Sequence, residues 1–410
     1  MDKLFELVQP VNGQPIQIAV LAFHSVIAAL VVIVLILVII LMSNTLVTPN
    51  NPTGWADKNY DAIQGSRKSL AQYMSANNIP DSAVMNRFTV ATASFGGIFT
   101  ENISLLNPWI GTVSPEAARL QVEAGARAIV LDIWPDPANF ASPVVCSMID
   151  NQAWPIQNMW MKLGLNKGTG RYSNWALLTR NKMPVEKILN ATMSAAFGSS
   201  PGIQNKDPFF LILKLHGAMT TSYLDNLGDI VRTSIGGRSM GTEWNKCMNQ
   251  NVIGTAPVNA FTSKVFVIVI PDIQSGYNSL PSVNTHSGFV AAFLNTRLGE
   301  ITNALERTAQ SIFFEPSGVG AIAAANQTNC ENPAGPPQTL AQTSFTVVQP
   351  TIGGDTTVND KLYENSGYVN CIQTGAQFVA LNFFSSKEAD GPMATFFDPN
   401  YFGTYSFRKI

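Results

Sequence analysis

The chain has 410 residues, of which 46% are hydrophobic and only 13% charged, with 25 basic against 27 acidic side chains. Soluble domains usually carry about 25% charged residues, so this composition indicates a protein that is partly withdrawn from bulk water. The lack of a basic surplus excludes a nucleic-acid-binding surface. The cysteines form no CxxC pair, which argues against a thiolate zinc cluster. They are Cys146, Cys247, Cys330 and Cys371.

A long apolar run lies near the N-terminus. From Ile16 to Met42 the chain contains no Asp, Glu, Lys or Arg, and at about 1.5 Å per residue a helix of this length crosses a hydrocarbon core of about 30 Å. A cleaved signal peptide has a shorter apolar stretch behind a basic region, whereas residues 1–15 hold one lysine against two acidic residues. We therefore predict a single-pass membrane anchor over 16–42 behind a short arm at 1–15. Too few basic residues flank the run to fix its orientation.

The remainder of the chain alternates between strand-like and helix-like runs. Residues 43–85 are polar and rich in Pro and Asn, and we expect a stalk with one short helix around 60–75. From residue 86 onward, short apolar runs alternate with amphipathic runs whose apolar residues recur every three or four positions. Strands are expected at 88–93, 126–134, 142–148, 208–215, 264–270, 311–314, 377–384 and 404–410. Helices are expected at 115–125, 184–197, 221–235 and 293–310.

This alternation predicts an α/β fold. Eight buried strands with helices between them, over about 320 residues, favour a (β/α)8 barrel of the TIM type over a doubly wound sheet. No GxGxxG or GxxxxGK[ST] motif is present, which excludes the dinucleotide-binding and P-loop classes. The predicted barrel comprises a first part at 86–315, an irregular linker loop at 316–354 and a final part at 355–410.

Two regions of the sequence resemble the phosphatidylinositol-specific phospholipase C superfamily, the PLC-like phosphodiesterases. PEAARLQVEAGARAIVLDIWPDP, followed by SPVVCSM, is similar to the start of the family's X region. VEKILNATMSAAFGSSPGIQNKDPFFLILKLHG is similar to its next helix and strand, and GAQFVALNF near the C-terminus is similar to the diagnostic run of the Y region. The two regions occur in the family's order, so the resemblance implies its barrel over most of residues 86–410.

The resemblance also implies a site, whose polar residues are largely replaced in this chain. Family members cleave a phosphodiester with two histidines as acid and base, and the eukaryotic members add a calcium ion held by carboxylate and amide oxygens. The histidine positions fall on Ser94 and Ser147. The calcium positions fall on Phe95, Val130, Asp132 and Lys214, of which Asp132 alone keeps an oxygen ligand. Two phosphate-binding lysines fall on Ile268 and Ile270. We therefore predict no catalytic histidine pair, no bound calcium and no other cofactor.

Three polar residues remain as a candidate residual site. Asp132 and Lys214 are expected to approach within salt-bridge distance, either as an internal ion pair or as an anion-binding pair. His216 stands where the family has a strand-end histidine, and it serves either a structural hydrogen bond or catalysis.

The leading hypothesis is a membrane-anchored, catalytically inactive PLC-like barrel that acts as a structural or docking component, with the lipid bilayer and membrane proteins as partners. Its low charge and short arm are similar to those of virion membrane proteins of large DNA viruses. The first alternative is an active phosphoric diester hydrolase for inositol phospholipids, rebuilt around Asp132, Lys214 and His216. A third possibility is a module that binds a phosphorylated ligand in the barrel.

Overall fold

The computed structural model describes residues 25–35, 68–100, 109–150, 175–198, 206–216, 221–239, 256–271, 294–297, 312–314, 346–348, 377–384 and 402–409. The chain divides into two compact units, Met1–Asn51 and Pro52–Ile410.

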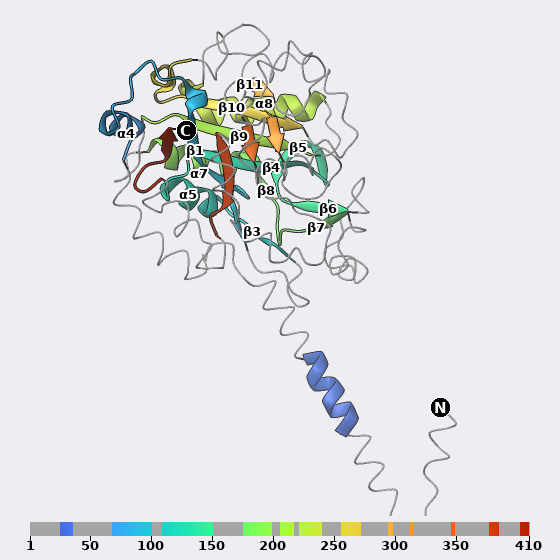
Figure 1. The fold of residues 1–410 in the computed structure, drawn as a ribbon. Helices are drawn as coiled ribbons and strands as arrows, with labels where there is room; N and C mark the ends of the chain where they lie inside the picture. Colours follow the sequence, from blue (N-terminus) through green and yellow to red (C-terminus); the bar gives the residue numbers. More distant parts are fainter. Residues whose placement is uncertain are drawn as a thin grey trace, which may run out of the picture. The chain divides into compact units, whose positions relative to one another are not determined.

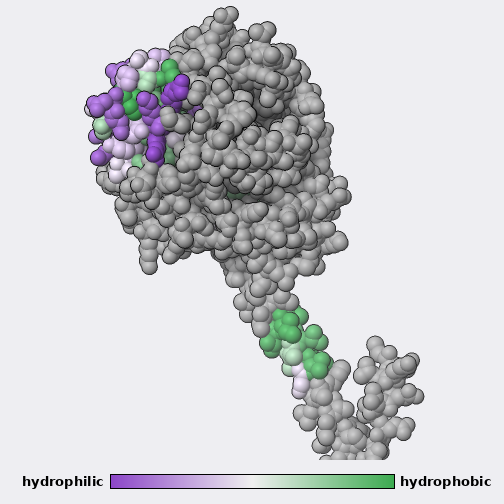
Figure 2. Space-filling model, viewed as in Figure 1, coloured by the Kyte–Doolittle hydropathy of each residue, from purple (hydrophilic) through white to green (hydrophobic). Residues whose placement is uncertain are grey.

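The first unit contains a helix at 25–35. Its large apolar side chains are exposed, with exposed fractions from 43% at Ile27 to 59% at Val26, and Figure 2 shows a green, hydrophobic surface along it. No helix in the described part of the chain is both long and apolar enough to cross a membrane. Residues 16–24 and 36–42 of the predicted anchor lie outside the described residues, so the anchor remains a prediction.

The second unit is a mixed α/β fold built on parallel strands (Figure 1). The described strands pair in the order β11-β10-β9-β4-β1-β14-β13-β12, and every neighbouring pair on this path is parallel. Their bounds are β1 Phe88–Ser94, β4 Ala128–Asp136, β9 Phe209–Leu215, β10 Val265–Pro271, β11 Leu294–Arg297, β12 Ile312–Phe314, β13 Thr346–Val348 and β14 Phe378–Asn382. These parallel strands and their helices confirm the α/β class. No pairing among the described residues joins β11 to β12, so closure of the predicted barrel remains a prediction.

The prediction of parallel barrel strands is wrong for two of the expected strands, those at 142–148 and 404–410. Strand β5 (Asn139–Val145) pairs antiparallel with β4, and β15 (Phe407–Lys409) pairs antiparallel with β1. The β4–β5 connection explains the first case, because residues 137 and 138 can close a hairpin but cannot make the long crossover that parallel neighbours need. The side chain of Asp136 accepts the Ala138 N–H at 2.8 Å and supports this turn.

Two short strands that the sequence did not predict, β11 and β13, belong to the parallel path of the sheet. Strand β11 occupies the beginning of the range expected to be helix, 293–310, and β13 lies within the range expected to be an irregular linker, 316–354. The other short strands are β2 Ile98–Thr100 with β3 Gly111–Val113, β6 Met148–Asp150 with β7 Trp175–Leu177, and β8 Met183–Pro184 beside β5.

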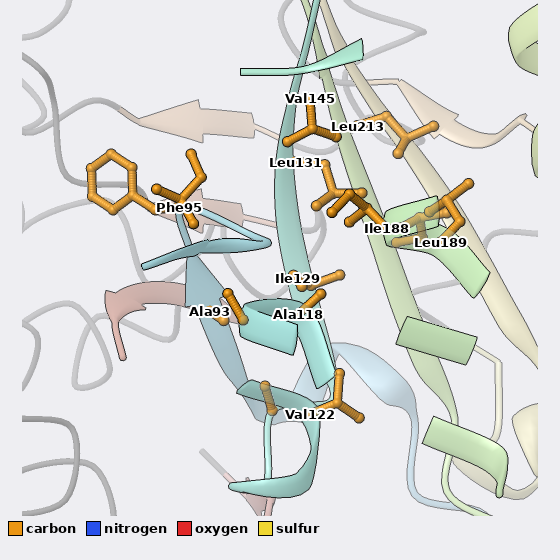
Figure 3. Packing of buried hydrophobic residues seen from close by; sticks show 14 of the residues in the cluster. Ala93, Phe95, Ala118, Val122, Ile129, Leu131, Val145, Ile188, Leu189 and Leu213 are labelled. Carbon is orange, nitrogen blue, oxygen red and sulfur yellow. The ribbon is translucent and has the colours of Figure 1, made fainter. Parts of the chain in front are cut away.

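Helices cover one face of the sheet. Helices α5 (Pro115–Glu123), α7 (Val185–Phe197) and α8 (Thr221–Ile235) pack on the alternate strand residues that include Ile129 and Leu131 of β4. Figure 3 shows Leu131 close to Ile188 and Leu189 of α7. Side chains alternate along a strand, so the residues between them form a second cluster on the opposite face of the sheet. We call these the inner cluster and the inner face; there Val130 packs with the aromatic rings of β9, β10 and β14.

Residues 68–85, which we call the strap, belong to this unit rather than to the expected stalk. The strap contains helix α4 (Leu70–Ala76), whose N-cap residue Ser69 forms a capping box with Gln72. Leu70, Met74 and Ile79 are buried in the inner cluster. The strap leads into the 3-10 helix η1 (Met85–Arg87). Two further 3-10 helices are η3 (Gly236–Arg238) and η6 (Val258–Phe261).

Candidate functional site

The candidate site lies at the carboxyl edge of the parallel strands, where this class of fold places its functional residues. Alternation from Val130 and Ile212 places Asp132, Lys214 and His216 on the inner face. Ser94 ends β1 on the same face. Strand register therefore brings most of the predicted residues to one edge, even though they are far apart in the sequence.

Asp132 and His216 form the best-defined pair at this edge. Their side chains meet at 2.8 Å between Oδ1 and Nε2, and the residues are only 5% and 8% exposed. The indole of Trp134 stacks on the imidazole with ring centroids 4.4 Å apart and planes within 4°. The backbone N–H of His216 also donates to the carbonyl of Ile133 at 2.9 Å. The imidazole is thus fixed in position by a carboxylate and by an aromatic plane.

The expected ion pair between Asp132 and Lys214 is not formed between these two described residues. They are register partners on neighbouring strands, but the partner of the Asp132 carboxylate is His216. Lys214 is only partly buried. Full burial of an ammonium group costs more hydration free energy than burial of an imidazole, which can be neutral. Shared register therefore did not suffice to make the salt bridge.

A tight turn follows β1 at two of the family positions, Ser94, which ends the strand, and Phe95, which begins the turn. Phe95 is buried with a left-handed backbone, φ 50°, and Gly97 has φ 73°. The buried amide of Gln121 on α5 holds this turn: its Oε1 accepts the Gly97 N–H at 3.0 Å, and its Nε2 donates to the Phe95 carbonyl at 3.2 Å. The hydroxyl of Ser94 is buried and has no hydrogen-bond partner among the described residues.

The second histidine position, Ser147, lies beyond the end of the antiparallel strand β5. It is buried, its backbone N–H donates to the Thr179 hydroxyl at 3.3 Å, and its carbonyl accepts the Leu178 N–H at 2.8 Å. The neighbouring Cys146 is a buried free thiol, and burial, assisted by the charge of Asp132, raises its pKa far above the ordinary value. Such a thiol is a poor nucleophile.

The residues at the calcium positions do not fit a calcium ion. Phe95 and Val130 are buried apolar side chains, and Lys214 carries a cation. Calcium needs six to eight oxygen ligands, and Asp132 supplies one carboxylate that already binds His216. Within the described residues no three His, Cys, Asp or Glu side chains are grouped as metal ligands. Of the two phosphate-binding positions, Ile268 is buried in the inner cluster, and the side chain of Ile270 lies outside the described ones.

Two residues that hold the site were missed from the sequence, namely Trp134 and Gln121. Trp134 carried a signal, because it follows Asp132 by two positions and must share its face of the strand. Gln121 carried none, since one glutamine in an amphipathic helix is expected on the solvent side.

The sequence matches no protein-family model and no curated protein. Among solved structures the chain is similar to PLC21 of L. pealei, with 12% identity and a TM-score of 0.52 over 80% of this chain and 37% of that one. It is also similar to PLC21 of S. officinalis, with 13% identity and a TM-score of 0.45 over 74% and 34% of the two chains. A calcium-dependent phosphoinositol-specific phospholipase C from Pseudomonas sp. gives 13% identity and a TM-score of 0.43 over 80% and 96%.

The match to the L. pealei protein covers only 37% of that protein's length, so the likeness concerns one part of it. At this identity the similarity concerns the fold, and it agrees with the X and Y motifs in the sequence. The chain therefore has a fold similar to that of part of the L. pealei PLC21 structure.

Proposed function

We propose that this chain is a membrane-anchored PLC-like barrel that does not cleave phosphodiesters and that acts as a structural or docking component at a bilayer. The observation that carries the proposal is the set of side chains at the family's catalytic and metal positions. Ser94 and Ser147 are buried hydroxyls, Val130 and Phe95 are buried apolar groups, and one carboxylate remains. Hydroxyls do not exchange protons near neutral pH as imidazoles do.

An activity assay on the full-length chain tests the inactive barrel. The protein is reconstituted in vesicles that contain phosphatidylinositol, and release of inositol phosphates is measured, together with cleavage of a soluble chromogenic inositol phosphodiester. We expect no cleavage above the protein-free control. Cleavage by the unmodified chain would refute this part of the proposal.

The anchor rests on the uncharged run at 16–42 and on the exposed apolar helix at 25–35 within it. Flotation of the full chain with neutral vesicles on a density gradient tests the anchor directly. The full chain should float, and a variant without residues 16–42 should remain at the bottom. Flotation of that deletion variant to the same extent would place membrane binding elsewhere and refute the anchor.

The alternative function is an active hydrolase with a rebuilt site, and the Asp132–His216 pair favours it. A histidine oriented by a carboxylate is a common general base, and Trp134 holds its ring plane. If the unmodified chain cleaves a phosphodiester and either Asp132→Asn or His216→Ala abolishes the cleavage, this alternative is correct. Cleavage that survives both changes would refute both functions.

A further inference from the structure

The strap covers the amino edge of the parallel strands, at the end opposite to the candidate site. Leu70, Met74 and Ile79 pack against the first residues of the strands, such as Phe88. Main-chain hydrogen bonds hold both ends of the strap. At its start the Lys68 N–H donates to the Thr404 carbonyl at 2.9 Å, and at its end residues 83–85 exchange hydrogen bonds with residues 256–258. The strap is therefore a short layer over an apolar end of the sheet.

A carboxylate is buried where the strap meets the sheet. Asp207 precedes β9, is 3% exposed, and accepts the backbone N–H of Leu70 at 2.9 Å through Oδ1. Its second oxygen, Oδ2, is buried without a hydrogen-bond partner in the described residues. An ionised carboxylate normally accepts several hydrogen bonds, so a buried one with a single donor is poorly solvated. Opening of the strap would remove the Leu70 contact and expose this group to water.

The charges around Asp207 compensate it only in part. Arg127, which precedes β4, is 2% exposed and donates to the Ala196 carbonyl at the end of α7 at 3.2 Å. It forms no ion pair within 4.0 Å of Asp207, although its charge lowers the pKa of Asp207. The larger effect of burial raises that pKa to about 6. Three lysines belong to the strap or to the segments that adjoin Asp207. Lys206 is exposed, Lys264 Nζ donates to the Ser239 carbonyl, and Lys68 Nζ lies over the Tyr405 ring.

From this arrangement we propose that the strap is a proton-coupled clasp, which closes over the neutral acid of Asp207 and opens to hydrate its carboxylate. The proton passes to solvent when the strap opens and returns when it closes. The sign follows from linkage: a carboxyl group that is harder to ionise in the closed state favours closure at low pH. The strap therefore opens more readily as the pH rises from about 4 toward 6, and the effect levels off above about 6.

Hydrogen exchange of the full-length chain, read by mass spectrometry on strap peptides, tests the clasp. With a closed-state pKa of about 6 and an ordinary pKa of 3.8 when open, the opening constant should rise about tenfold from about pH 5 to about pH 7.5, after correction for intrinsic exchange. Amides of β4 and β9 should not follow this change. Asp207→Asn should remove the pH dependence, whereas Asp229→Asn, at an exposed residue paired with Arg232 on α8, should retain it.

A second variant keeps the test decisive if Asp207→Asn does not fold. The Tyr73 hydroxyl accepts the Lys409 N–H at 2.9 Å, so Tyr73→Phe should loosen the strap at both pH values and keep their tenfold ratio. Strap exchange that is independent of pH in the unmodified chain would overturn the proposal. A pH response that survives in Asp207→Asn, or that β4 and β9 share in full, would overturn it equally.

Discussion

Substitution of Gly96 by alanine tests the turn that carries Ser94 and Phe95. A Cβ at this position would lie 2.5 Å from the Val130 carbonyl oxygen, 2.5 Å from Leu131 Cδ2 and 2.7 Å from Ile129 Cγ1. The carbonyl oxygen is main chain of the central strand β4 and already accepts the Gly96 N–H at 2.8 Å. Because the strand cannot retreat, the turn must move and weaken that hydrogen bond.

The expected loss for Gly96→Ala is about 2–4 kcal/mol in the free energy of unfolding, from overpacking of about 1–3 kcal/mol and a weakened buried hydrogen bond of about 1 kcal/mol. Gly237→Ala is the matched control, because a Cβ there meets no atom within 4 Å, and it should change stability by less than about 0.5 kcal/mol. Urea denaturation of the full chain in detergent micelles, followed by tryptophan fluorescence, measures both. A Gly96→Ala variant as stable as Gly237→Ala would refute the close packing of this turn on β4.

Two substitutions and one labelling experiment probe the surroundings of the site. Gln121→Leu leaves the Gly97 N–H and the Phe95 carbonyl without their buried partner, so urea denaturation should show a loss of about 2–3 kcal/mol. His216→Leu leaves the Asp132 carboxylate buried and unpaired, and should lower the free energy of unfolding by about 3–5 kcal/mol. The double variant with Asp132→Leu should recover at least half of this loss. Equal losses in the single and double variants would contradict the pairing. The buried Cys146 thiol should resist alkylation in the native protein and react only after unfolding, as peptide mass spectrometry of the labelled chain can show.

The sequence predicts the long elements of this fold well. Helices expected at 115–125, 184–197 and 221–235 are found at Pro115–Glu123, Val185–Phe197 and Thr221–Ile235. Their apolar stripes and the apolar runs of β4 and β9 follow local periodicity, which sequence alone contains. Strand direction is not local in this way: the SPVVCSM run is as apolar as a parallel core strand, and only the short connection at 137–138 turns it into a hairpin partner of β4.

For the candidate site, too, the sequence predicts which residues belong to it but not how they pair. Asp132, Lys214 and His216 were each identified from the sequence, because each stands at the end of an apolar run. Which two of them pair depends on the register of β4 against β9 and on side-chain reach. The sequence predicts a stalk in place of the strap for a related reason, since its polar composition hides three apolar contacts and the Asp207 acceptor 137 residues away.

The geometry around His216 bears on the proposal that this chain does not cleave phosphodiesters. Cleavage needs a proton acceptor for the attacking hydroxyl and a proton donor for the leaving group on opposite sides of phosphorus. One imidazole, held in plane by Trp134 and bound through Nε2 to Asp132, can serve one side of that reaction. The other side falls on Ser94, whose hydroxyl is fully buried behind a turn fastened by Gln121. Replacing both Ser94 and Ser147 with histidine should therefore leave the chain inactive in the vesicle assay, because Val130 and Lys214 still deny oxygen ligands to a metal that would stabilise the phosphoryl charge. Activity in that double variant would show that acid and base alone were missing.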